Sequence, residues 1–295
     1  DLWVALFRAL TLGLLSWEAT YGLAFVGVFA FAAYAIYSFG RRTMGTVAGL
    51  VAAVLWVLDM GDYREGGWSY TVDWAVWVQI LAMGFLLLAL GALIQLWERG
   101  RAWDYARAGL LLAAALLSHQ MNVMLLGLAL PLLLVARWLA DSRPMGREVW
   151  RAAGACLLGA TLAGFYLIPM LMRSGWTTNI GDLWRPFDAT VRGLMDGTVF
   201  ANNWPLVVAL GLVGAVIGIL RRHAVAIFLT LLAALLLVVC TSTAFEEFSL
   251  VALTKAFAKI QWQRLIIPAK ACFYLLAGLA VMVAGASSRS LLKGG

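Results

Sequence analysis

Four carboxylates lie close together in one polar stretch of an otherwise apolar sequence. Asp59, Asp62, Glu65 and Asp73 fall within 15 residues, and a Gly-Gly pair lets the backbone turn sharply between them. A carboxylate can deprotonate or orient a hydroxyl group, and several carboxylates together can bind a divalent cation such as Mg or Mn. We therefore predict that Asp62, Glu65 and Asp73 are acid/base or metal-binding residues. A solvated acidic loop without chemistry is the alternative.

Candidate cations follow later in the chain. Arg264 and Lys270 lie at the start of the apolar run "QRLIIPAKACFYLLAG", where Pro268 is expected to interrupt the helix. Arg173 begins a long polar loop. Guanidinium and ammonium groups at the edge of a membrane can bind an anion such as a lipid phosphate, so these three residues are candidate phosphate ligands. Snorkelling, or internal pairing with a loop carboxylate, is the alternative.

One histidine and four tryptophans complete the candidate site. His119 stands in "LLSHQMN" at the end of an apolar run, where it can act as an acid/base or form a hydrogen bond at a helix end. Trp68, Trp74, Trp176 and Trp184 lie within polar stretches, where an indole ring can stack on a sugar or line an acceptor cleft. An aromatic belt at the membrane interface is the alternative for the tryptophans.

The elements that must position these residues are transmembrane helices. The chain of 295 residues is 63% hydrophobic and 13% charged, with a mean hydropathy of +0.89, whereas soluble proteins have roughly 25% charged residues. Apolar runs close to the ~20 residues needed to cross a bilayer recur without the alternation of a β-barrel. We predict an all-α polytopic bundle with about nine spans, at residues 20–39, 44–60, 76–97, 106–119, 122–140, 152–172, 204–220, 223–241 and 265–285.

Loop charges set the orientation of this bundle. The loops near residues 40, 98, 137 and 221, with the C-terminal tail, hold 13 Lys/Arg against 4 Asp/Glu, and the rest of the chain holds 9 against 11. Because cytoplasmic loops keep the positive excess, the predicted extracytoplasmic loops are those at 61–75, 118–122, 173–203 and 242–264. The third of these is long enough that we expect a short helix in it. Topology explains the basic charge, so no nucleic-acid partner is predicted.

Residues 1–18 are predicted to form a separate unit. They are apolar but carry Arg8 and are flanked by Trp3 and Trp17, which suits a helix lying in the membrane interface, with a tenth span as the alternative. Residues 19–295 then form the transmembrane bundle.

Four motifs together resemble a known family of membrane proteins. They are, in chain order, "DYREGGWSYTVDWAVWVQ", "LLSHQMN", "FYLIPMLMRSGWTTNIGDLW" and "IQWQRLIIPAKACFYLLAG". Over most of residues 20–280 the chain resembles the bacterial multi-spanning proteins related to 6-pyruvoyl-tetrahydropterin synthase, which in turn look like members of the GT-C glycosyltransferase superfamily. The pterin part of that family name is no guide to the chemistry.

The resemblance implies a GT-C-like bundle in the bacterial inner membrane that transfers a sugar from a polyprenyl-phosphate donor at the extracytoplasmic face. Its implied partners are membrane lipids and the lipid-linked donor. The usual catalytic carboxylate of the superfamily lies in a first outer loop, after a first transmembrane helix. The sequence departs from that pattern, because residues 1–18 resemble the end of this loop, so we expect the 295 residues to be the middle of a longer protein.

A non-catalytic function stays open. A GT-C-like membrane scaffold could hold other membrane subunits through its wide outer loops without transferring a sugar. A transporter is disfavoured, because ionisable residues are almost absent from the middle of the predicted spans.

Overall fold

The computed structural model describes residues 2–62, 65–142, 144–173, 184–247 and 260–293, and these residues form helices without a strand. The α-helices are α1 (Leu2–Leu10), α2 (Trp17–Thr43), α3 (Thr46–Val57), α4 (Val78–Arg99), α5 (Ala102–Ser118), α6 (Met121–Asp141), α7 (Gly146–Leu162), α8 (Gly164–Met172), α9 (Phe187–Asp196), α10 (Pro205–Leu220), α11 (Ala224–Val239), α12 (Ser242–Glu247) and α14 (Ile266–Lys293). Two short turns of other helical types are η1 (Ser69–Asp73) and η4 (Trp262–Leu265). The predicted all-α class is confirmed for this part of the chain.

Each of the predicted spans falls on a helix. The range 152–172 falls on two, because α7 and α8 meet at an angle of 76°. Within the described residues, four helices are long and apolar enough to cross a membrane, or five if this bent pair is one span. The four are α2, α4, α6 and the combined η4–α14 helix from Trp262 to Ala286, while α3, α10 and α11 are apolar but shorter. A helical protein with several membrane-spanning helices is therefore confirmed.

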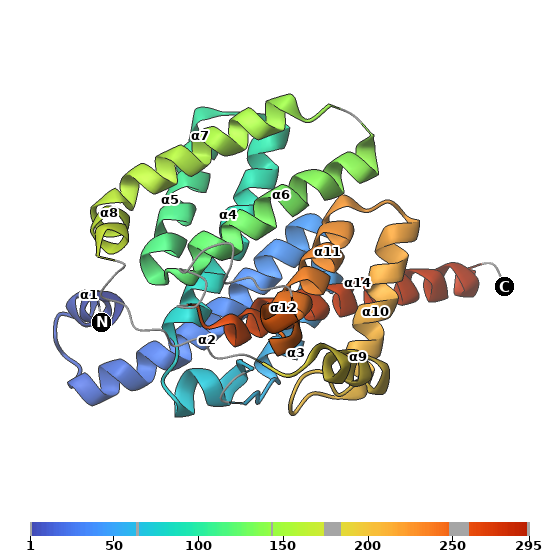
Figure 1. Cartoon of the computed structure of the whole chain (residues 1–295), viewed down its shortest axis with the longest axis horizontal. Coiled ribbons are helices and arrows are strands. Elements are labelled where there is room, and N and C mark those ends of the chain that lie inside the picture. Colours follow the sequence, from blue (N-terminus) through green and yellow to red (C-terminus); the bar gives the residue numbers. More distant parts are fainter. Residues whose placement is uncertain (1, 63–64, 143, 174–183, 248–259, 294–295) are drawn as a thin grey trace.

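Helix α14 is the centre of the bundle. It packs against α3, α10 and α11, and residues 265–280 are all buried. Small residues permit the close approach of the neighbouring helices, because a Cβ on Gly278 would overlap the backbone of α3 at Ala48, and one on Gly214 of α10 would overlap the Leu276 carbonyl. In Figure 1, α14 crosses the middle of the molecule behind α12.

Pro268 does not interrupt the last helix, as the sequence had suggested. Helix α14 begins at Ile266, so Pro268 lies in its first turn. The backbone N–H groups of a first helical turn have no partner inside the helix, and a proline there costs no hydrogen bond. The proline thus fits the start of the helix that carries Lys270.

Two predicted short helices have counterparts in the structure. In the segment 1–18, α1 ends at Leu10, and Leu12 and Gly13 both take positive φ before Ser16 caps the start of α2. The helix at the N-terminus is therefore shorter than predicted, and its place in a membrane interface stays a prediction. The short helix expected in the loop 173–203 is confirmed as α9.

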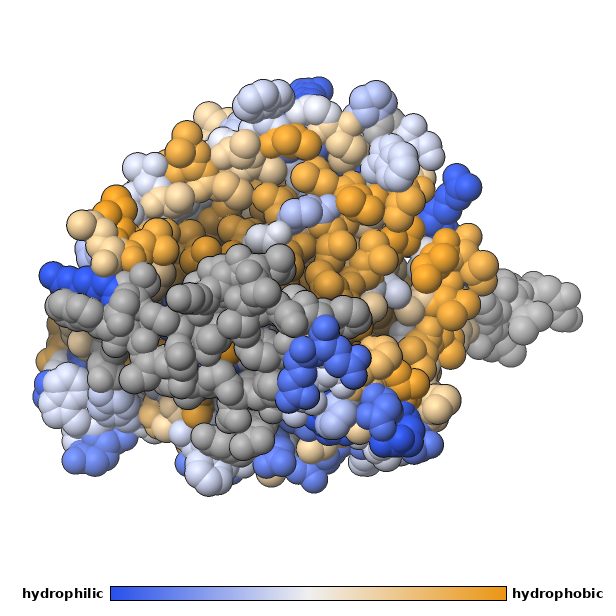
Figure 2. All heavy atoms as spheres, viewed as in Figure 1, coloured by the Kyte–Doolittle hydropathy of each residue, from blue (hydrophilic) through white to orange (hydrophobic). Residues whose placement is uncertain are grey.

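Two of the predicted outer segments lie at one edge of the molecule. In Figure 1, the chain between α3 and α4, which includes η1, and the helix α9 lie along the lower edge. Figure 2 shows hydrophilic side chains at this edge and a broad apolar surface above it on the right, where α10 exposes Leu212, Val216 and Leu220. An apolar belt beside a polar edge fits a bundle that faces lipid with its sides and water with its end.

Candidate functional site

The loop after α3 folds back tightly on itself. The Asp62 N–H donates to the Gly66 carbonyl (3.1 Å), and the Trp68 N–H donates to the Asp59 carbonyl (2.9 Å). Gly66 and Gly67 have φ of +78° and +81°, a conformation that strains other residues. This geometry turns Asp59 inward and leaves Asp62 exposed.

Asp59 and Lys270 form a buried ion pair. The Lys270 Nζ lies 2.8 Å from Asp59 Oδ2, and both side chains are completely shielded from solvent. The ring of Phe200 lies on another side of the ammonium group, with its centroid 6.0 Å from Nζ. Internal pairing with a loop carboxylate, the alternative left open for Lys270, is what the structure has.

Glu65 ties the same loop to the chain around α9. Its Oε1 accepts hydrogen bonds from Arg185 Nη2 (3.0 Å) and Trp184 Nε1 (3.3 Å), and its Oε2 accepts one from the Ala201 backbone N–H. The Arg185 guanidinium also stacks on the Trp184 ring, 4.2 Å from the centroid. A further bond joins the two segments, from the side-chain Nδ2 of Asn202 to the Gly61 carbonyl (2.7 Å). The bond between Glu65 and Trp184 therefore has a structural role, because it holds the loop after α3 against the segment before α9.

Arg264 meets His119 where several segments converge. The Arg264 Nη1 lies 3.4 Å from His119 Nε2. The backbone carbonyl of Arg264 accepts a hydrogen bond from Gln79 Nε2 (2.8 Å), and Gln79 Oε1 accepts one from the Tyr70 hydroxyl (3.1 Å). Arg264 is thus held between η1, the first turn of α4 and the break between α5 and α6.

In the contact between Arg264 and His119, both side chains are hydrogen-bond donors and neither is an acceptor. Its Nδ1 accepts the Met121 backbone N–H (3.1 Å), so the proton of the neutral ring is assigned to Nε2. Burial and, next, the charge of Arg264 lower the pKa of His119 from 6.5 to about 4, which keeps the ring neutral at pH 7. Nε2–H and the guanidinium are then two facing donors. The oxygen of an anion beside them would satisfy both.

The other predicted site residues do not join this contact in the part of the chain that the structure describes. Asp73 is exposed at the end of η1, and Arg173 is exposed directly after α8. The Trp68 ring packs edge-on against Phe29 in the core, with centroids 5.5 Å apart. Trp74 is 57% exposed. Trp176 lies outside the described residues.

Sequence reasoning missed several residues of this region. Asp59 was noticed only as one of four clustered carboxylates, and nothing in the sequence joined it to Lys270. Gln79 reads as one polar residue in an apolar run. The asparagines Asn202 and Asn203 bond to the Gly61 carbonyl and to the Tyr274 hydroxyl, respectively. A pair of amides directly before a predicted span is a signal that could have drawn attention to them.

A metal site is not evident among the described residues, where no three His, Cys, Asp or Glu side chains are grouped in a way that could hold an ion. Two of the four clustered carboxylates, Asp59 and Glu65, form ion pairs with Lys270 and Arg185. The divalent cation at Asp62, Glu65 and Asp73 stays a prediction.

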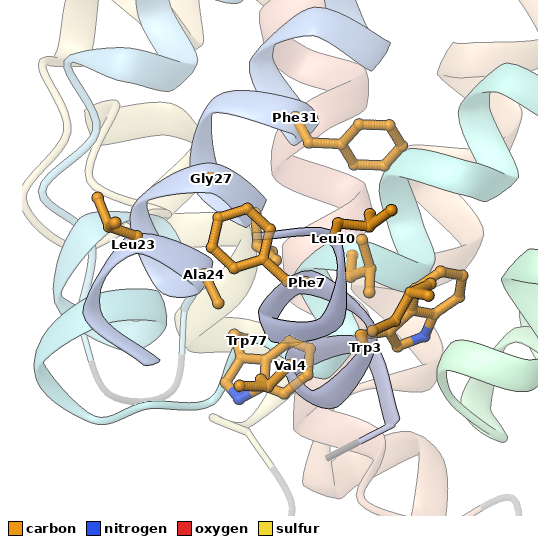
Figure 3. A pocket seen from close by; sticks show the side chains of 12 residues that line it. Trp3, Val4, Phe7, Leu10, Leu23, Ala24, Gly27, Phe31 and Trp77 are labelled. Atoms are coloured by element: carbon orange, nitrogen blue, oxygen red, sulfur yellow. The ribbon is translucent and has the colours of Figure 1, made fainter. Parts of the chain in front are cut away.

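An apolar cavity of about 360 Å³ lies between α1, α2 and the start of α4. Figure 3 shows aromatic rings from three segments around it: Trp3 and Phe7 of α1, Phe31 of α2, and Trp77 just before α4. Aliphatic side chains such as Leu23 complete the lining. A cavity with this lining suits a hydrocarbon chain and is unsuited to a sugar or a phosphate.

Acidification is expected to destabilise the protein through His119. Its pKa is about 4 in the folded protein and near 6.5 when exposed, so the stability that the neutral ring contributes is complete above pH 6.5 and is lost as the pH falls toward 4. Unfolding midpoints should be measured from about pH 7 to about pH 4.5 for the natural protein and for His119→Gln. His223, whose pKa burial also lowers, titrates in both proteins. Equal pH dependence of the two would contradict the prediction.

Comparisons with known proteins place the chain in a family. No curated protein and no solved structure matches it. A family model described as "6-pyruvoyl-tetrahydropterin synthase related domain; membrane protein" matches residues 4–267, a range that includes Asp59, Glu65, His119 and Arg264. The chain belongs to this family of membrane proteins, as its sequence motifs had indicated.

Proposed function

We propose that the protein is a GT-C-like glycosyltransferase that takes a sugar from a polyprenyl-phosphate donor at the extracytoplasmic face of the bacterial inner membrane. The proposal includes a bundle of about nine spans, in which the shorter helices α3, α5, α10 and α11 also cross part of the membrane. The observation that carries it is the pair of facing donors on Arg264 and His119, next to η1 and the first turn of α4.

Arg264 is the residue best placed to bind the donor phosphate. Within the described residues, no carboxylate lies within 4 Å of its guanidinium, whereas Lys270 and Arg185 are neutralised by Asp59 and Glu65. A guanidinium presents several donors in a plane and binds phosphate oxygens in pairs. The Nε2–H of His119 would add a further donor without adding charge.

The apolar cavity supports a lipid donor. Trp77 and Leu81 line it, and Gln79, between them in the first turn of α4, bonds to the Arg264 carbonyl. Residues 77 and 79 point to nearly opposite sides of a helix, so the cavity and Arg264 lie at the same end of α4 but on different sides of it. A long isoprenoid chain could place its phosphate near Arg264 and part of its length in the cavity.

The transfer itself would use an exposed carboxylate. The acceptor hydroxyl oxygen would form a bond to the anomeric carbon of the sugar while the bond from that carbon to the phosphate oxygen breaks. The hydroxyl proton would pass to Asp62 or Asp73, and the polyprenyl phosphate would leave with the bonding electron pair. Trp74, exposed beside η1, would supply a surface for the sugar or the acceptor.

Arg264→Ala is expected to weaken the binding of polyprenyl phosphate roughly 10- to 100-fold, the usual value of one charge-assisted hydrogen bond or slightly more. Binding should be measured with purified protein in lipid nanodiscs, and the unfolding midpoint should be measured alongside it. Arg192→Ala is the matched control, since it removes an exposed arginine of the same region whose partner is Asp188 on the same helix. Unchanged affinity in Arg264→Ala would remove the central residue of the proposal.

A non-catalytic scaffold is the second candidate, and one observation favours it. The two buried carboxylates of the first loop are both consumed by structural pairs, with Lys270 and Arg185. Assays of sugar transfer separate the candidates: loss of transfer in Asp62→Asn or Asp73→Asn with lipid-phosphate binding retained supports the enzyme. Binding without any transfer by the natural protein supports the scaffold.

A further inference from the structure

We propose a second anion site at the opposite end of the bundle, where a cleft between α2 and α5 binds the phosphate of an anionic lipid headgroup. The cleft has a volume of about 370 Å³ and is lined by Tyr34, Tyr37, Ser38, Arg41, Arg42 and Arg107. We name it the Arg42–Arg107 cleft. It does not depend on the glycosyltransferase proposal.

Two arginines converge on one neutral oxygen in this cleft. Arg42 Nη1 donates to Gln95 Oε1 (2.8 Å), and Arg107 Nη1 lies 3.5 Å from the same oxygen. In the described part of the chain, neither arginine has a carboxylate within ion-pair distance. Two guanidinium groups that share one uncharged acceptor repel each other, and a phosphate between them would neutralise that charge with paired hydrogen bonds.

The geometry of α2 points to a lipid as the source of the phosphate. Tyr34, Ser38 and Arg42 are spaced four residues apart and share one face of the helix, which puts Tyr34 about two turns deeper in the bundle than Arg42. Tyr34 is 58% exposed and lies nine residues before Thr43, the last residue of the spanning helix α2. A tyrosine so placed can lay its ring against lipid and direct its hydroxyl toward the headgroup region.

The cleft lies beside apolar surface. Leu110, about one turn after Arg107 on α5, is 56% exposed. A free phosphate ion has no use for this apolar surface, whereas the glycerol and upper acyl chains of a phospholipid would lie against it. Basic clefts beside apolar surface at the cytoplasmic ends of spanning helices are known to bind anionic headgroups.

The cleft is separate from the Arg264–His119 contact. Gln95 anchors the arginines near the end of α4, and Gln79 anchors Arg264 near its start. Sixteen residues of helix separate the two glutamines, which is about 24 Å. The cleft also lies on the side where the loop charges place the cytoplasm.

The test measures lipid retention and thermal stability of the purified protein. The natural protein in mixed nanodiscs is expected to retain phosphatidylglycerol at least tenfold over phosphatidylcholine. The double variant Arg42→Gln/Arg107→Gln should lose this preference. The matched control is Arg221→Gln/Arg222→Gln, which removes the same charge from exposed residues after α10, on the same predicted side, and should keep it.

Gln95→Glu separates binding from folding. A carboxylate at this position would neutralise Arg42 and Arg107 internally, so the variant should be at least as stable as the natural protein and still lose the preference for phosphatidylglycerol. Retention of the preference in both cleft variants, or equal loss in the control, would overturn the site. Stabilisation by millimolar inorganic phosphate as large as that by phosphatidylglycerol would overturn the lipid as its ligand.

Discussion

Lys270→Met is expected to destabilise the bundle by about 3–5 kcal/mol, because it leaves the Asp59 carboxylate buried without its partner. Both side chains of the pair are fully shielded, and the Nζ–Oδ2 distance is 2.8 Å. Methionine has nearly the length of lysine, so little packing is lost with the charge. Asp59 must then either stay ionised in an apolar environment or take up a proton, and both states are costly.

Equilibrium unfolding in mixed detergent and dodecyl sulfate micelles, followed by tryptophan fluorescence, measures this loss. Asp59→Asn/Lys270→Met is the decisive comparison, since removing both charges should restore most of the stability that the single substitution removes. Arg264→Gln controls for the loss of a cation from the same end of α14. A double variant no more stable than Lys270→Met would show that the pair stabilises through its shape and hydrogen bonds and that its charge is secondary.

The helices could be predicted well because long apolar runs leave a chain in lipid few alternatives. In a bilayer, backbone groups must be satisfied within the segment, so a run such as 76–97 becomes α4 with ends shifted by two residues. The 76° bend between α7 and α8 could not be predicted. It occurs at Ala163, directly before Gly164 and six residues before the proline of α8, and one glycine in an apolar run is too weak a signal to mark a break.

The sequence predicted the region of the candidate site, but it did not show which of the residues face the core, which face solvent and which pair with one another. Asp59 and Asp62 are three residues apart, and positive φ angles at Gly61, Gly66 and Gly67 decide that one faces the core and the other faces solvent. The partner of Asp59 is 211 residues away. Only tertiary packing brings such residues together, and a single sequence carries no signal of that pairing.

The tryptophans of the candidate site also differ in whether they are packed inside the protein or exposed. All four were predicted from their polar neighbours to line a cleft, yet Trp68 packs on Phe29 and Trp184 donates to Glu65. Of the three tryptophans that the structure describes, only Trp74 is largely exposed. Polar neighbours in a sequence therefore indicate a location near the interface, and they do not indicate which face of a ring is free.

Glu65→Ala is expected to release the chain at 184–204 before the bundle unfolds. The carboxylate receives three donors from that segment, and its removal leaves the Trp184 Nε1–H and the Ala201 N–H without their acceptor. Each unsatisfied buried donor costs about 1–3 kcal/mol, unless the segment opens and hydrates it. Opening is the less costly response, because Arg185 is already 30% exposed and the segment contributes few residues to the core.

Hydrogen–deuterium exchange resolves this local effect. Exchange at residues 184–204 should increase at least tenfold in Glu65→Ala, while α14 stays protected. Glu65→Gln should give a smaller increase, since its amide oxygen can still accept from Trp184. Asp188→Ala, which removes the exposed pair with Arg192 inside α9, should have almost no effect.

The outcome bears on how an acceptor would reach the proposed site. An increase confined to 184–204 would show that this segment is held over the Asp59–Lys270 pair by one buried carboxylate and can open without loss of the fold. Equal increases in 184–204 and α14 would instead make Glu65 part of the global core. In that case an acceptor would have to approach Arg264 without opening of the segment 184–204, along a path past Trp74 and Asp73.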